Sequence, residues 1–347
     1  MYKKYLGGNY MKISLKKFLI FLLVFFLTQL LIITPQVFAN SNPVEMPVFS
    51  KTQTCNKEFD EDIVISTEER IMKIDAETGE TTVADINYSE VATILELMET
   101  EKNYSTELIV QAPTLKTTSR LSRLNSFLSV SPRTTGYTIC LGNTNSDSQR
   151  PICRINSDGG QGSGFLIGDK YLLTAAHCVL TPDASVFGYW SAKAGYCNGN
   201  YSQEMGWNTV YYSENWTTYG GASSFDWAIV ELDGNYGSSV GYLYCTKYYN
   251  YEDMINTSVS AWGYPGTTMT GEYLCYSNGT ITAANSWSFD ADCTIERGFS
   301  GGPTRISDNT ACGINVGMYS SNNRTGTLKS VRFNDNLFNL ILDLLNN

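Results

Sequence analysis

The feature that most constrains the fold is a change in sequence texture after Arg133. From there to the C-terminus, short runs of aromatic and β-branched residues alternate with turns rich in Gly, Asn, Asp and Ser. Short strands with frequent turns predict an antiparallel β-barrel or β-sandwich. Residues 164–167 and 171–174 flank a Gly-Asp-Lys turn and predict a hairpin, and the apolar spacing of residues 337–345 predicts one C-terminal helix.

The first 39 residues have the pattern of a targeting segment. Lysines without any acid precede the apolar stretch Phe18–Ile33, and the small residue Ala39 ends a cleavage-like site. This order predicts a secretory signal peptide that is cut after Ala39. The alternative is an uncleaved anchor helix, but the apolar stretch is shorter than the ~20 residues that span a bilayer.

Residues 40–133 differ from the β-rich part because they are denser in charge and contain no Trp. Residues 71–74 predict a strand of a hairpin, and residues 89–102 predict a helix that Ser89 would cap. The stretch 113–135 is rich in Ser, Thr and Arg and has no acid, which is typical of a solvated linker. The predicted domains are 1–39, a signal peptide; 40–133, a mixed α+β pro-segment and linker that is cut near Arg133; and 134–347, a folded β domain.

Cysteine content and charge exclude several function classes. Nine cysteines suit an oxidising compartment, whereas zinc ligation is disfavoured because the chain has no CxxC pair and one histidine. A net charge of -10 argues against a partner that is held through a nucleic-acid phosphate backbone. We therefore expect no metal, no cofactor and no nucleic acid.

Three residues predict nucleophilic catalysis. His177, the single histidine, follows the predicted hairpin, and Asp226 heads an apolar strand, where a buried carboxylate needs a partner. Ser300 lies in the turn Gly298-Phe299-Ser300-Gly301-Gly302. A serine hydroxyl needs a base such as histidine, and the imidazole needs an acceptor such as aspartate to hold its tautomer. The backbone N–H groups of Gly298 and Ser300 would form the oxyanion hole.

These motifs resemble the chymotrypsin-like serine peptidases, and most of all the branch of V8 protease and the glutamyl endopeptidases. The matching segments are Gly162–Leu166, Thr174–Cys178, Gly263–Gly266, Asp292–Thr294 and Gly313–Ile314. The resemblance covers about residues 136–347. It implies an all-β fold of two six-stranded antiparallel β-barrels with a C-terminal helix, in which His177 and Asp226 belong to the first barrel and Ser300 to the second. It also implies a disulfide between Cys178 and Cys197.

The resemblance further implies where specificity is set. The substrate pocket would include Thr294, Ile295, Arg297, Asn315 and Gly317. Phe299 replaces the aspartate that receives the new N-terminus in trypsin-like members, so that activation switch is absent. Asn315 stands where the glutamyl branch has histidine, and Thr294 stands where trypsin has aspartate. Neither a Glu preference nor a Lys/Arg preference is therefore carried over.

The sequence predicts a secreted, extracellular serine endopeptidase, made as a zymogen, that acts as a monomer on proteins or peptides. Contact with a membrane is expected only during export. The main alternative is an inactive peptidase homologue that serves as an extracellular binding module. A further alternative is a sugar-binding protein that uses the tyrosine clusters near Tyr211 and Tyr248.

Overall fold

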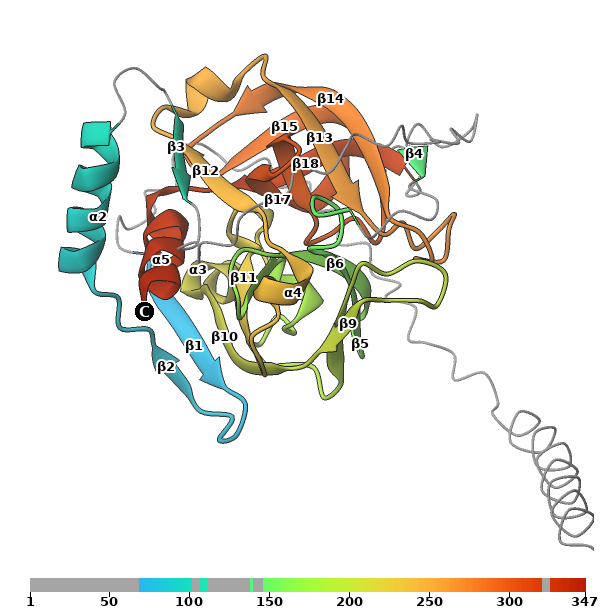
Figure 1. Cartoon of the computed structure of the whole chain (residues 1–347), viewed down its shortest axis with the longest axis horizontal. Helices are drawn as coiled ribbons and strands as arrows, with labels where there is room; N and C mark the ends of the chain where they lie inside the picture. The colour runs from blue at the N-terminus through green and yellow to red at the C-terminus, as the bar shows by residue number, and fades with distance from the viewer. Residues whose placement is uncertain (1–68, 102–106, 111–137, 140–145, 320–324) are drawn as a thin grey trace, which may run out of the picture. The chain divides into compact units, whose positions relative to one another are not determined.

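The computed structural model describes residues 69–101, 107–110, 138–139, 146–319 and 325–347 (Figure 1). The predicted signal peptide and the predicted cut near Arg133 lie outside these residues. These described residues all belong to one compact unit. None of the helices in the described ranges is long and apolar enough to span a bilayer.

The first sheet has nine strands, and it carries the predicted hairpin. In spatial order they are β2 (Thr81–Val83), β1 (Ile71–Asp75), β10 (Trp207–Ser213), β11 (Ala228–Leu232), β7 (Tyr171–Thr174), β6 (Gly160–Leu166), β5 (Ile152–Ser157), β8 (Trp190–Ala194) and β9 (Gln203–Met205). Strands β6 and β7 pair with Phe165 opposite Leu173, which confirms the hairpin. Closure of this sheet into a six-stranded barrel stays a prediction.

The second sheet contains a closed, six-stranded antiparallel barrel, as predicted. Around the ring the strands are β16 (Pro303–Ser307), β13 (Ser258–Gly263), β14 (Cys275–Ala284), β15 (Ser288–Glu296), β18 (Thr325–Arg332) and β17 (Thr310–Tyr319). The pairing of β16 with β17 closes the ring. Phe289, Ile281 and Leu328 are buried in its core together with Phe299, the residue before Ser300.

Three further strands border this barrel. Strand β12 (Tyr244–Tyr248) runs parallel to β17 and pairs on its other side with β3 (Glu107–Val110), whereas β4 (Thr138–Ile139) pairs with β14. The sheet is therefore extended at β12 by residues that come from the N-terminal third of the chain.

The helices end or connect the strands. They are α2 (Tyr88–Glu101), α3 (Glu214–Thr218), α4 (Gly237–Val240) and α5 (Asp335–Asn346), with short 3-10 helices at Ala176–Cys178, Ser223–Phe225 and Tyr251–Met254. Helix α5 confirms the predicted C-terminal helix, and the Asn334 side chain caps it by accepting from Leu337 N. The predicted cap of α2 was wrong. The helix begins before Ser89, and Asn87 Oδ1 accepts from Glu90 N at 3.3 Å.

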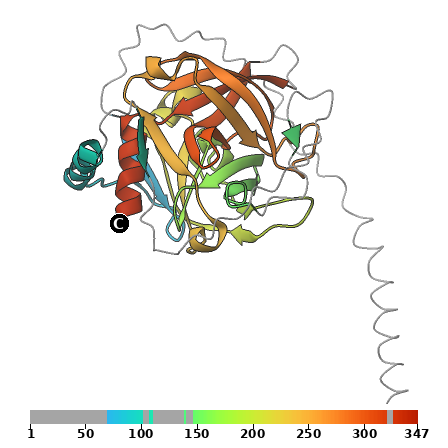
Figure 2. The ribbon, with the colours of Figure 1, turned by 45° about the horizontal axis from the view of Figure 1, so that its top comes forward.

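The predicted hairpin near residues 71–74 is also present. Strand β1 pairs with β2, and it pairs on its other side with β10, so it lies inside the first sheet (Figure 1). Helix α2 lies beside α5 in both views of the ribbon (Figure 2).

Candidate active site

The first sheet brings His177 and Asp226 together. Strands β7 and β11 pair with Thr174 opposite Ala228, so the residues just after β7 lie beside those just before β11. Asp226 Oδ2 lies 2.6 Å from His177 Nδ1, and Asp226 Oδ1 accepts from the backbone N of His177 at 2.9 Å. One carboxylate thus fixes both the backbone and the imidazole of His177.

The two side chains differ in exposure. The Asp226 side chain is 7% exposed, whereas the imidazole of His177 is 41% exposed. Burial alone would lower the pKa of His177, but the Asp226 carboxylate and the neighbouring Cys178 thiol outweigh it and hold that pKa well above its usual range. The imidazole is therefore open to solvent on one side, and its neighbours stabilise an imidazolium at this position.

The second sheet carries Ser300 in a tight turn between β15 and β16. Gly298 and Gly301 have φ angles of +99° and +83°, in the region that L side chains rarely adopt. A Cβ atom at Gly298 would also collide with the backbone of Tyr264, and one at Gly301 with that of Ser163. The glycines are therefore required for the turn to come this close to its neighbours.

The turn leaves two backbone donors open. Phe299, Gly301 and Gly302 donate their N–H groups to backbone carbonyls. Within the described part of the chain, the N–H groups of Gly298 and Ser300 have no such acceptor. Two adjacent, unpaired N–H groups beside a serine hydroxyl are the arrangement that stabilises an oxyanion.

The orientation of the Gly298 donor is fixed through the preceding carbonyl. Arg297 O accepts from Gly266 N at 2.8 Å. Because the peptide bond between Arg297 and Gly298 is trans, the N–H of Gly298 points away from Gly266. The loop that contains Gly266 thus sets the direction of one of the two open donors.

Two buried side chains that the sequence analysis missed hold this region. The Ser163 hydroxyl donates to Gly298 O at 2.7 Å and accepts from Tyr264 N at 2.9 Å. Glu296 is 2% exposed, and its carboxylate accepts from Thr267 N at 3.0 Å and Thr268 N at 2.9 Å. The signal in the sequence that could have identified Glu296 is its position. It is an acid, four residues before Ser300, in a strand that is otherwise expected to be buried.

Backbone contacts join the two halves of the site. Ser300 O accepts from Ser163 N at 2.7 Å, and Cys178 Sγ lies 3.6 Å from the same carbonyl. Among the residues that the structure describes, no hydrogen bond links the His177 imidazole to the Ser300 hydroxyl. In the absence of substrate such catalytic hydrogen bonds are often long, and they tighten when substrate binds.

The five residues of the predicted pocket fall into two groups, two that are buried in the barrel and three that are more exposed. Ile295 and Asn315 turn their side chains into the barrel, and both are buried. The Asn315 amide donates to Trp262 O at 2.9 Å, and its Oδ1 accepts from Thr304 Oγ1 at 2.7 Å. The Asn315 side chain therefore links β17 to β13 by a hydrogen bond, and its amide is not exposed at the surface.

The other three residues of the predicted pocket are more open. Thr294 and Gly317 are half-buried, and Arg297 is exposed. A Cβ atom at Gly317 would meet no atom within 4 Å. The assignment of these three residues to the substrate pocket stays a prediction.

The predicted disulfide between Cys178 and Cys197 is not formed in the structure, which corrects that expectation. Cys178 and Cys197 are both free thiols. The physical reason is placement. Cys178 is buried and points its Sγ toward Ser300 O, whereas Cys197 begins a turn in which its N–H bonds to Asn200 O.

A comparison with protein families decides the class of the domain. Residues 162–314, which contain His177, Asp226 and Ser300, match the family described as the trypsin-like peptidase domain. Residues 162–314 carry a trypsin-like peptidase domain. This peptidase domain is also similar to a glutamyl endopeptidase of Bacillus licheniformis, with 29% identity over 210 residues and 57% of the chain. That match spans 65% of the relative's own length.

A solved structure supports the fold of the peptidase domain. The structure of a Glu endopeptidase in complex with MPD superposes with a TM-score of 0.54 at 22% identity. The match covers 61% of this chain and 97% of that one.

Proposed function

We propose that this chain is a secreted serine endopeptidase, made as a precursor and acting as a monomer on proteins or peptides. Ser300 is the nucleophile, His177 the general base and acid, and Asp226 the residue that orients His177. Gly298 and Ser300 supply the oxyanion hole. The predicted signal peptide over residues 1–39 would direct export, and a cut near Arg133 would create the N-terminus of the mature catalytic chain.

In the first step, Ser300 Oγ attacks the carbonyl carbon of the scissile peptide while its proton moves to His177 Nε2. The carbonyl oxygen becomes an oxyanion, which the N–H groups of Gly298 and Ser300 stabilise by about 3 kcal/mol each. His177 then gives the proton to the leaving amine. The C–N bond breaks, and an acyl group stays on Ser300.

In the second step, water attacks the acyl carbon and gives a proton to His177. The bond to Ser300 breaks, the proton returns to Ser300 Oγ, and the acid product leaves. Throughout both steps Asp226 keeps the proton of His177 on Nδ1 and stabilises the imidazolium that forms.

The observation that carries the proposal is the pair of hydrogen bonds between Asp226 and His177. The two carboxylate oxygens hold the backbone N and Nδ1 of His177 at 2.9 Å and 2.6 Å. This leaves Nε2 as the nitrogen that can exchange a proton with a hydroxyl. The open N–H groups of Gly298 and Ser300 in the neighbouring turn add independent support.

Glutamate preference is not part of the proposal, although the relative of 29% identity is a glutamyl endopeptidase. The Asn315 amide is engaged inside the barrel and the chain has no second histidine, so no imidazole is available for a glutamate side chain. Cleavage of a peptide library by the secreted protein identifies the residue preferred before the scissile bond.

The deciding experiment compares Ser300→Ala with wild type in casein hydrolysis. We expect the variant to lose about 10⁶-fold in kcat, because the nucleophile is removed. Ser258→Ala is the matched control, since Ser258 is an exposed serine at the start of β13. Hydrolysis by Ser300→Ala at the wild-type rate would refute the assignment.

Labelling with an organophosphonate separates the peptidase from an inactive binding module of the same fold. The peptidase is expected to be modified at Ser300 and at no other serine, because only an activated hydroxyl attacks phosphorus at a useful rate. A folded protein that binds peptides but stays unlabelled would support the binding module instead.

A further inference from the structure

The described residues before the catalytic domain are built into both sheets. We call residues 69–101 and 107–110 the docking segment. Its strand β1 pairs with β10 from Ile71 opposite Ser213 to Asp75 opposite Thr209. Its strand β3 pairs with β12 from Glu107 opposite Tyr248 to Val110 opposite Cys245. One segment thus supplies a strand to each of the two sheets.

Side chains at the start of the docking segment reinforce the first of these pairings. Arg70 forms a bidentate ion pair with Glu214, with N···O distances of 2.7 and 2.6 Å. Glu69 is 7% exposed and accepts from Asn336 Nδ2 at 3.0 Å. Ile71 and Ile74 lie three residues apart in a strand, on opposite faces, and both are buried. Both faces of β1 are therefore covered.

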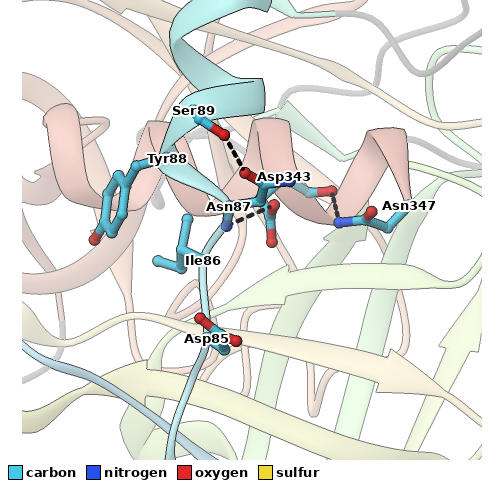
Figure 3. A pocket seen from close by; sticks show the side chains of 7 residues that line it. All are labelled: Asp85, Ile86, Asn87, Tyr88, Ser89, Asp343 and Asn347. Atoms are coloured by element: carbon cyan, nitrogen blue, oxygen red, sulfur yellow. Dashed lines mark hydrogen bonds between the residues drawn. The ribbon is translucent and has the colours of Figure 1, made fainter.

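Helix α2 of the docking segment covers one side of the C-terminal helix. Residues Leu340–Leu344 of α5 are all buried, and five consecutive residues exceed one helical turn. A helix that is buried on every side needs a partner on the side away from the sheets. Asn87 N, just before α2, donates to Asp343 Oδ1 at 3.2 Å (Figure 3). Val91, within α2, is buried.

These contacts do not use the groups proposed to perform catalysis. Among the described residues, no hydrogen bond or ion pair joins the docking segment to His177, Asp226, Gly298 or Ser300. Its partners are β10, β12, α3 and α5. The segment therefore completes the sheet edges and the helix packing without using the groups proposed to perform catalysis.

We infer that the docking segment stays bound after the precursor is cut, so that the mature enzyme is a complex of two chains. The inference rests on the proposed processing near Arg133. Main-chain hydrogen bonds of an added strand give affinity without a covalent link, as in other complexes formed by strand addition. Release would expose the edge of β10 that β1 covers, the edge of β12 that β3 covers, and one side of α5.

The test uses the full chain with Ser300→Ala and a recognition sequence for an added protease placed within residues 111–133. After cleavage the mixture is separated by size exclusion under native conditions, and each peak is analysed by mass spectrometry. We expect the N-terminal fragment to elute together with the catalytic chain. Elution of the fragment as a separate peak, with the catalytic chain alone in the other, would overturn the inference.

This design keeps two failures apart. The added protease makes the cut, so the result does not depend on whether the chain is a peptidase, and casein hydrolysis by the wild type tests the proposed function separately. An inactive wild type whose fragment stays bound would reject the proposed function only. An active wild type whose fragment is released would reject the two-chain complex only.

A pair of variants locates the binding. Ile74→Asp puts a charge at a buried position of β1 and should release the fragment about tenfold faster or more. Glu77→Ala, in the exposed turn of the same hairpin, should leave release unchanged. If Ile74→Asp prevents folding of the uncut chain, Arg70→Ala serves instead, because it removes only the ion pair with Glu214 and should still speed release. Equal release rates for Arg70→Ala and Glu77→Ala would argue against docking through β1.

Discussion

The two halves of the candidate active site are fixed in different ways. The half on the first sheet depends on one carboxylate, because Asp226 holds both the backbone and the imidazole of His177. The half on the second sheet depends on many contacts spread around the Ser300 turn, including those of Ser163 and Glu296. The first half should therefore fail with a single substitution, whereas the second should weaken by degrees.

The largest expected effect comes from the single carboxylate. Asp226→Asn keeps the size of the side chain but allows its amide to donate, which favours the wrong tautomer of His177. We expect kcat to fall about 10⁴-fold, as it does when this change is made in other serine peptidases with the same triad, whereas KM changes little. Kinetics on a chromogenic peptide measure both constants.

Asp253→Asn is the control for this change, since Asp253 is an exposed acid in a surface 3-10 helix. A loss below tenfold for Asp226→Asn in a folded protein would mean that another group orients the imidazole.

A smaller effect is expected in the second half. Glu296→Gln removes the negative charge from the oxygen that accepts from both Thr267 N and Thr268 N, and it puts an NH₂ group where the other oxygen accepts from Thr268 Oγ1. The loop that orients the Gly298 donor should shift, and a shift near 1 Å costs about 10²-fold in rate. We expect kcat to fall about tenfold to a hundredfold with KM nearly unchanged.

The matched control is Glu252→Gln, at an exposed position. Melting temperatures of both variants separate a change of rate from a loss of fold. If Glu296→Gln lowered stability but left kcat at the wild-type value, Glu296 would have no positioning role.

The smallest effect concerns the pH dependence set by the neighbours of His177. Only the neutral imidazole can accept the Ser300 proton, so activity should rise with pH through the pKa of His177. Since Asp226 and Cys178 hold that pKa above its ordinary value of 6.5, the midpoint of kcat/KM should lie above 6.5. Cys178→Ala should lower the midpoint, because the thiol contributes to the increase.

This profile also reports the influence of Cys178. A midpoint that is identical in wild type and Cys178→Ala would indicate that the Cys178 thiol does not raise the pKa of His177. A wild-type midpoint below 6.5 would contradict the predicted influence of Asp226.

Short-range patterns in the sequence predicted much of the fold and of the candidate site. The β6–β7 hairpin and helix α5 were found because alternation and helical spacing show which residues are buried within one element. The position of Asp226 before an apolar strand correctly indicated a buried carboxylate with a partner. Each of these inferences needed only neighbours in the chain.

The sequence did not reveal contacts whose partners are distant in the chain. Glu296 reads as one acid in a strand, and its hydrogen bonds to the loop at Thr267 depend on how β13 and β15 are arranged in the barrel. Asn315 is buried with its amide bonded to Trp262 O, a carbonyl 53 residues earlier that no local pattern identifies as its partner. The strand β1 was predicted, yet nothing local identified β10 as its neighbour.

The contacts of α5 also bear on when the fold can be completed. Asn336 meets Glu69, 267 residues earlier, and Asp343 meets Asn87, 256 residues earlier. Helix α5 is therefore needed to hold residues that were synthesised more than 250 positions earlier. Contacts of such long range form slowly and late. The part of the fold that joins β1 and α2 to α5 can therefore form only after α5 has been synthesised.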